Sequence, residues 1–319
     1  MKAISHINKK LALILLLQVI LCLGVWWPKD SKTMTHPNPL AAVEFSSMSH
    51  LEISQGGETP KHLTLEKKGG IWVVPDQQNF PADEGMIDSA FSKLKSLALG
   101  GPVARQSSSH KKLQVSEADF QRKVAFDGGD NSKAVGFYLG SSPQFKQVYL
   151  RAMGEDEVFT SDKVSAFDFS VESKDWVQKS LINISSEMLQ SIEIKREHET
   201  LKISRSEKKG DETPGSWLLN GKEVKPGALD PILRNLSDLQ LTQVVGQQEK
   251  PEYGLNRPKA VVGVKFLDKD QKLQEKTFTI AKLKSGDFIA RVTGMEYLVG
   301  LAPYQVNPMI ESKVKDLIK

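Results

Sequence analysis

A long internal repeat is the feature of this sequence that most constrains its fold. The stretch LEISQGGETPKHLTLEKKGGIWVV begins at Leu51, and IEIKREHETLKISRSEKKGDETPGSWLL begins at Ile192, about 140 residues later. Each reads as short strands around a Lys-Lys-Gly turn, followed by a strand that contains one tryptophan, Trp72 or Trp217. The sequence therefore predicts two copies of one folding unit.

An amphipathic helix is predicted after the tryptophan strand of each copy. Apolar residues recur at identical intervals over 86–97 and 228–239, with a constant offset of 142 residues. This spacing places them on one side of a helix, so each helix should cover one face of its sheet. Asp83 after Pro81 in the first copy, and Pro226 in the second, are the expected N-terminal signals.

Hairpins follow both helices. Residues 120–140 and 260–280 alternate apolar and polar side chains on either side of a polar turn, which is typical of hairpins with one buried face. Two residue types of the next strand pair then recur 140 residues apart: Arg151 and Arg291, and Gly154 and Gly294.

The predicted fold class is α+β, with two tandem copies of a mainly antiparallel sheet and covering helices. Tight turns between short strands favour antiparallel pairing. The first repeat is expected over 45–185 and the second over 186–319, and each is large enough to bury a core. Both copies are expected to end in helices, at 165–182 and 303–318.

An apolar segment precedes the repeats. Residues 11–27 are apolar except for Gln18, and a helix of this length reaches about 25 Å, near the short end of what spans a bilayer. The sequence predicts an uncleaved transmembrane helix, with lysines before it that favour a cytoplasmic N-terminus. The residues expected to contact lipid include Leu11, Leu15, Leu21, Trp26 and Trp27.

This orientation predicts a single-pass protein of the inner (cytoplasmic) membrane. Residues 1–10 would be cytoplasmic, 28–44 a tether, and the repeats would lie in the periplasm or outside the cell. Two alternatives stay open, a cleaved signal peptide without an A-x-A exit and a lipoprotein cleaved before Cys22. Cys22 is the only cysteine, which excludes an intramolecular disulfide and a cysteine-cluster zinc site.

Neither the charge balance nor any sequence motif identifies a catalysed reaction. Lys and Arg number 43 against 39 Asp and Glu, and this near-balance argues against a nucleic-acid partner. No histidine pair has metal-ligand spacing, so no metal site or cofactor is predicted. The acids Glu155, Asp156 and Glu157 are the best candidates for a hydrolytic pair, but their place between two strands favours a turn.

Four residues that recur in both copies are predicted to be structural. Trp72 and Trp217 are expected to pack their strands against the following helices. Arg151 and Arg291 lie in apolar strands and are expected to form ion pairs within each copy.

The sequence EYGLNRPKAVVGVKF resembles a bacterial family known as domain of unknown function 4340, through Tyr253, Gly254, Leu255 and Pro258. The recurring tryptophans and the VYLRAMGEDEVF strand pair add to the resemblance. The first copy departs from the motif, with three different residues at the matching places: Leu113, Val115 and Ala118. The resemblance implies an extracytoplasmic protein with an N-terminal membrane helix, from a family often found beside gliding-type ABC transporter components and without assigned catalytic residues.

These observations predict a non-enzymatic, membrane-anchored scaffold that acts through protein–protein interaction. Its expected contacts are the lipid bilayer, through residues 11–27, and another envelope protein, such as a component of an ABC-type transport complex. The alternative is a cell-envelope hydrolase or a small-ligand-binding module that uses the cleft between the two repeats.

Overall fold

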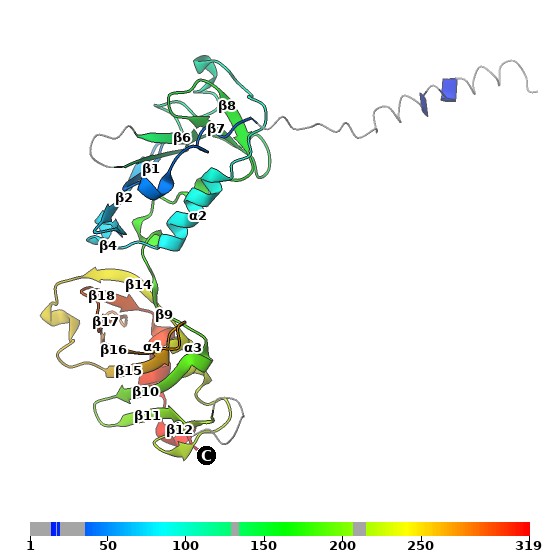
Figure 1. The fold of residues 1–319 in the computed structure, drawn as a ribbon. Helices are drawn as coiled ribbons and strands as arrows, with labels where there is room; N and C mark the ends of the chain where they lie inside the picture. Colours follow the sequence, from blue (N-terminus) through cyan, green and yellow to red (C-terminus); the bar gives the residue numbers. More distant parts are fainter. Residues whose placement is uncertain (1–13, 17, 20–35, 129–133, 207–214) are drawn as a thin grey trace, which may run out of the picture.

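The structure is a computed structural model that describes residues 14–16, 18–19, 36–128, 134–206 and 215–319. Its strands form two sheets that follow one another along the chain, and all strand pairs within them are antiparallel over the described residues (Figure 1). The predicted pair of antiparallel sheets with few helices is thus confirmed.

The first sheet has eight strands in the order β4-β3-β2-β1-β5-β6-β7-β8. Its strands are β1 (His50–Gln55), β2 (Lys61–Lys68), β3 (Ile71–Val74), β4 (Phe80–Pro81), β5 (Arg122–Asp127), β6 (Val135–Leu139), β7 (Val148–Ala152) and β8 (Val158–Ser161). The hairpin predicted over 120–140 is present as β5 and β6, and its tip at 129–133 lies outside the described residues.

The second sheet has ten strands in the order β13-β12-β11-β10-β15-β16-β17-β18-β14-β9. Its strands are β9 (Ser180–Asn183), β10 (Leu189–Lys195), β11 (Thr200–Arg205), β12 (Trp217–Leu219), β13 (Lys222–Glu223), β14 (Asp238–Gly246), β15 (Ala260–Leu267), β16 (Leu273–Lys282), β17 (Phe288–Val292) and β18 (Leu298–Leu301).

The two sheets repeat one strand order. Reading from β4 to β8 in the first sheet corresponds to reading from β13 to β18 in the second. The pairing agrees in detail, because Leu51 pairs with Leu65 across β1 and β2 while Ile192 pairs with Ile203 across β10 and β11. The internal repeat in the sequence therefore corresponds to a repeated sheet.

The first sheet also has short counterparts of β14 and β9. Val103 donates its backbone N–H to Val158 at 2.8 Å, beside β8, as β14 lies beside β18. His36 forms a bridge to Leu99, as β9 pairs with β14. Bridges this short do not extend the first sheet, but they place 36 and 99–104 where the second repeat has full strands.

One helix follows the tryptophan strand of each repeat, as predicted. In α2 (Glu84–Lys95) the side chain of the N-cap residue Asp83 accepts from Met86 N at 3.1 Å. In α3 (Asp230–Ser237) the N-terminal signal expected at Pro226 is wrong. The helix begins four residues later, with Pro231 in its first turn, where the missing N–H of proline costs nothing.

The C-terminal helical prediction holds for the second repeat only. The predicted segment forms α4 (Pro303–Glu311) and α5 (Val314–Leu317). Pro308 lies inside α4 and has no N–H to donate to the carbonyl of Tyr304; Asn235 Nδ2 of α3 donates to that carbonyl instead, at 2.9 Å.

The helix predicted over 165–182 is wrong. That segment contains two single 3-10 turns, at Ala166–Asp168 and Ser173–Asp175, and then β9. The backbone of this segment pairs with strands instead. Val177 forms a bridge to Ala82 beside β4, and Ile182 pairs with Leu239 of β14. One extended segment therefore borders both sheets.

The position of β9 concerns the boundary between the two repeats, which the sequence predicts between residues 185 and 186. β9 falls before residue 186, within the segment expected to belong to the first repeat, yet it is an edge strand of the second sheet. A single stretch of chain connects the two sheets in Figure 1.

The N-terminal expectations fall mostly outside the described residues. Leu11, Leu21, Trp26 and Trp27 are not described, while Leu15 is helical and 64% exposed. Over the residues that the structure describes, no helix has the length and apolar character needed to cross a membrane. The described part of the expected tether contacts the first repeat: Leu40 is buried, and Asn38 Nδ2 donates to Leu94 O at 2.7 Å.

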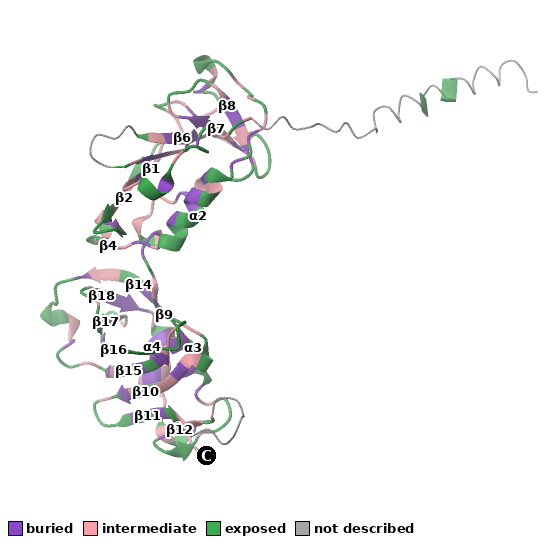
Figure 2. Ribbon diagram, viewed as in Figure 1, coloured by how far each residue is buried: buried purple, intermediate pink, exposed green. Residues whose placement is uncertain are grey.

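The main hydrophobic core lies between the helices and one face of each sheet. Figure 2 shows buried positions gathered on the strands and on parts of α2, α3 and α4. A smaller apolar cluster lies elsewhere in each repeat, around Val115 in the first and Leu255 in the second. Leu255 belongs to the Tyr-Gly-Leu-Pro motif, so that motif packs into a secondary core.

Candidate functional site

The first sheet carries a polar cluster on neighbouring strands β1, β2 and β5. Glu52, Ser54 and His62 alternate with the buried residues of their strands, so their side chains lie on the face away from the main core. His62 Nδ1 lies 3.1 Å from Ser54 Oγ and 3.8 Å from Glu52 Oε1, and Lys123 Nζ lies 3.3 Å from the same carboxylate oxygen.

This cluster has the residue types of a hydrolytic triad without its geometry. A catalytic histidine uses one ring nitrogen for the nucleophile and the other for the acid. Here Nδ1 faces both Ser54 and Glu52, while Nε2 faces Thr64 Oγ1 at 3.0 Å. The His62 side chain is 56% exposed, so the cluster is an open polar surface rather than an enclosed reaction site.

The second sheet presents a corresponding face with different residues. Glu193 occupies the place of Glu52, and Thr200 and Lys202 take those of His62 and Thr64. On the same face, a Cβ added to Gly263 of β15 would meet nothing within 4 Å. Both sheets therefore expose polar strand residues on the side opposite their main core.

The acids Glu155, Asp156 and Glu157 lie in the turn between β7 and β8, as their spacing indicated. Buried His110 lies 2.8 Å from the backbone carbonyl of Asp156. Glu155 and Glu157 line a cavity of about 230 Å³ together with His36 and other residues of the first repeat. Over the described residues, no group of three His, Cys, Asp or Glu side chains is arranged to hold a metal ion.

The equivalent arginines have different partners. Arg151 is 4% exposed and donates to two backbone carbonyls, Nε to Val115 O at 2.7 Å and Nη1 to Glu155 O at 2.8 Å. Its guanidinium also lies 4.6 Å from the centre of the Tyr138 ring. These partners take the place of the carboxylate that the sequence led us to expect.

Arg291 does form an ion pair, with Glu249, on an exposed surface. The glycines that follow the two arginines agree more closely, because Gly154 and Gly294 both have a φ of +80°. This left-handed backbone explains why glycine occupies both turns.

The first of the two tryptophans lies in an aromatic cluster. Trp72 is buried, with its ring 6.2 Å from Phe91 of α2. Phe91 in turn lies 4.7 Å from Phe45 and 6.2 Å from Phe126. Lys67 Nζ lies 5.9 Å from the indole centre, so this ring is enclosed on several sides.

Trp217 has a more open environment. Arg205 places its guanidinium 4.3 Å from the indole centre, and burial lowers the pKa of this arginine. Beside the indole is a cavity of about 360 Å³, lined by Leu229 and Leu233 and by the polar residues Lys225 and Asp230. The expected packing of strand on helix is thus accompanied here by a hollow.

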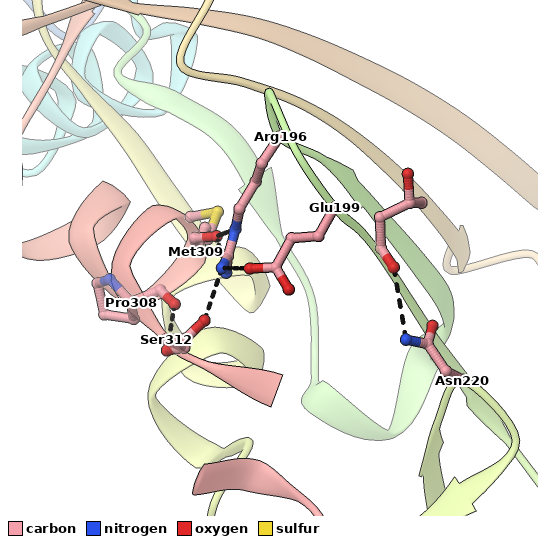
Figure 3. A network of polar contacts seen from close by, with 7 residues as sticks. Arg196, Glu199, Asn220, Pro308, Met309 and Ser312 are labelled. Carbon is pink, nitrogen blue, oxygen red and sulfur yellow. Dashed lines mark hydrogen bonds and ion pairs between the residues drawn. The ribbon is translucent and has the colours of Figure 1, made fainter. Parts of the chain in front are cut away.

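An arginine that no sequence pattern indicates organises the C-terminal helix, and its side chain is 9% exposed (Figure 3). Arg196 Nε donates to Met309 O at 2.9 Å and Nη1 donates to Ser312 O at 2.6 Å, while Nη1 also pairs with Glu199 at 2.9 Å. These contacts satisfy carbonyls at the end of α4 and fix the helix to the β10–β11 hairpin. No spacing in the sequence signals this pairing, because it joins residues more than 100 positions apart.

Comparison with known proteins gives a family and no closer relative. The chain matches no curated protein and no solved structure. The model of the family described as domain of unknown function (DUF4340) matches residues 72–258, which run from Trp72 in the first repeat to Pro258 of the Tyr-Gly-Leu-Pro motif. Because this match covers more than half of the chain, the protein belongs to the DUF4340 family.

Proposed function

We propose that this protein is a non-enzymatic scaffold, held at the outer side of the inner membrane by residues 11–27, that binds another envelope protein. The observation that supports this most is the duplicated sheet with polar residues exposed on neighbouring strands of each copy, around Glu52 in the first and Glu193 in the second. Two corresponding polar surfaces on one chain suit a protein that holds partners together. The family resemblance makes an ABC-type transport complex the first assembly to test.

The contacts between the repeats support this proposal. The segment 177–183 pairs with the edges of both sheets, and Tyr297 of the second repeat contacts residues 78–80 of the first. These contacts add to the covalent connection between the repeats. The two exposed faces therefore belong to halves of one chain that also touch each other.

Affinity purification of the full chain from solubilised membranes tests the proposal. We expect at least one envelope protein to be recovered at a constant ratio. Glu52→Lys in β1 reverses a charge on the first exposed face, and Glu193→Lys makes the equivalent change in β10. At least one of the two should lower recovery of the partner several-fold. No partner above the level of an unrelated anchored protein would contradict a scaffold role.

An envelope hydrolase is the second candidate, and one observation favours it. Glu155 and Glu157 line the same cavity, although within the first repeat rather than between the repeats. Two carboxyl groups beside a cavity are the minimum for acid–base hydrolysis of glycans. The double variant Glu155→Ala, Glu157→Ala tests this candidate: an unchanged phenotype in cells would remove it, while loss of function with a folded protein would favour it over the scaffold.

A further inference from the structure

The two repeats differ most where the tryptophan strand meets the helix. In the first repeat, three phenylalanines fill the space near Trp72: Phe45, Phe91 and Phe126. The constant offset of the helices assigns Leu233 as the counterpart of Phe91, and strand pairing assigns Val264 as the counterpart of Phe126. Both rings are thus replaced by smaller side chains.

The cavity beside Trp217 follows from one of these replacements. Leu233 is equivalent to Phe91 by the constant offset of the two helices, and both are 7% exposed. Phe91 extends its ring toward Trp72, whereas Leu233 and Trp217 both line the hollow of about 360 Å³. A volume near the lower end of known ligand sites has therefore opened beside the tryptophan of the second repeat.

The lining of this cavity indicates the chemistry of an occupant. Its apolar part consists of the indole and the side chains of Leu229, Leu233 and nearby residues, and its charged part has two lysines and two acids: Lys225, Lys319, Glu223 and Asp230. Because the two positive and two negative side chains balance, the lining favours neither an anionic nor a cationic ligand.

Part of this polar lining is available for a ligand. Lys319 pairs with Glu223 at 2.8 Å, and Lys225 Nζ donates to Asp316 O at 3.2 Å. The structure gives the Asp230 carboxylate no hydrogen-bond partner among the described residues, so it can accept from hydroxyl groups. A neutral molecule with an apolar face and several hydroxyls fits an indole wall beside such acceptors.

We propose that the cavity beside Trp217 is a binding site for a neutral saccharide. The sugar would place its apolar face toward the indole and Leu233, and its hydroxyls toward Asp230 and the lysines. This inference does not rest on the scaffold proposal, since a ligand site can exist in either a scaffold or an enzyme.

Ligand-observed NMR on the full chain tests the site, with glucose, N-acetylglucosamine and maltose as probes at millimolar concentration. The decisive variant is Leu233→Phe, which introduces the ring that the first repeat carries at this place. We expect it to weaken saccharide binding by about tenfold or more. Leu273→Phe, the same change at a 61% exposed position of β16 away from the cavity, is the matched control and should leave binding unchanged. Circular dichroism verifies that both variants fold.

Trp217→Leu provides a second variant in case Leu233→Phe fails to fold, and it should abolish the saccharide signal. Binding that survives a folded Leu233→Phe protein would overturn the proposed site. Absence of a signal from all three sugars in the unmodified protein would overturn the proposed ligand class. So would binding of glutamate or lysine in their place.

Discussion

The ring of Tyr297 lies 5.0 Å from the ring of Phe80 at an interplanar angle of 73°, and this edge-on contact joins the second repeat to the first. The Tyr297 hydroxyl also lies 3.0 Å from Gln78 O and 3.1 Å from Asn79 O. Since a phenol has one hydrogen, it donates to one of these carbonyls at a time. Apart from segment 177–183, this is the most specific contact described between the repeats.

Removing the Tyr297 hydroxyl should loosen this contact. In Tyr297→Phe the ring contact with Phe80 stays while one hydrogen bond is lost, and we expect the free energy of unfolding to fall by about 1 kcal/mol. Urea denaturation followed by circular dichroism measures the change. Tyr304→Phe, at a position 73% exposed in α4, is the control and should change stability little. Equal effects of the two substitutions would show that Tyr297 does not hold the repeats together.

The Arg196 contacts predict a large effect of a single side chain. The Arg196 side chain is 9% exposed, and its loss leaves the carbonyls of Met309 and Ser312 without a donor. We expect Arg196→Met to lower the free energy of unfolding by about 2–3 kcal/mol. Lys195→Met, at the neighbouring exposed position, should cost far less. A change below that of Lys195→Met would contradict the role assigned to Arg196.

Substitution of the two equivalent arginines should give unequal results. Arg151→Met removes donors from Val115 O and Glu155 O in a buried setting, so a loss of about 2–3 kcal/mol is expected. Arg291→Met breaks an exposed pair with Glu249, which is worth no more than about 1 kcal/mol. Thermal unfolding of the two variants side by side measures the difference. Similar losses of stability in the two variants would contradict the expectation that the buried arginine contributes more than the exposed one.

The pH dependence of stability should report on Asp168. Burial alone would raise the pKa of Asp168, but hydrogen bonds from Lys93 and Ser165 together with the charge of Lys93 outweigh it and lower the pKa. A lowered pKa in the folded state stabilises the protein above the unfolded value of about 3.9, and this stabilisation is lost as the pH falls through the folded pKa.

Asp168→Asn tests this pH dependence. The variant should be less stable than the unmodified protein by about 1 kcal/mol near neutral pH, because the pair with Lys93 is partly exposed. The difference should shrink below about pH 3.9. Urea denaturation at several pH values measures it, and a difference that stays constant down to strongly acidic pH would contradict the lowered pKa.

Much of the fold could be predicted because it depends on local patterns. The alternation in 260–280 predicted the one buried face of that hairpin, and the shared intervals of 86–97 and 228–239 located both helices. The single buried face expected for 120–140 is wrong, because Tyr138 on the second face of β5 and β6 packs into the smaller cluster around Val115. The repeat strengthens weak strand patterns, since each occurs twice in the sequence. Local spacing thus predicted the helices and hairpins, which depend on local hydrogen bonds and on burial of one side.

The errors arose where distant parts of the chain compete for a segment. Residues 165–182 have apolar spacing compatible with a helix, but Val177 and Ile182 pair with strands of different sheets. The sequence does not show those strands as neighbours. The apolar spacing likewise places Leu239 in the second helix, but α3 ends at Ser237 and Leu239 lies in β14, where it pairs with Ile182 of β9.

The candidate sites were still harder to predict. The carbonyl partners of Arg151 come from Val115 and Glu155 and carry no side-chain signal in the sequence. The hollow beside Trp217 depends on a ring that Leu233 lacks, and no local pattern around Leu233 indicates that a ring is missing there.

The central claim is that the two halves of this chain are copies of one sheet-and-helix unit, with the second copy opened beside its tryptophan. A crystal structure of the full chain measures this most directly, by superposing β1–β8 with α2 on β10–β13, β15–β18 and α3. We predict the same strand order in both halves, with Phe91 and Leu233 at one place and solvent or ligand density beside Trp217. Different strand orders in the two halves, or a side chain that fills the space beside Trp217, would contradict the account.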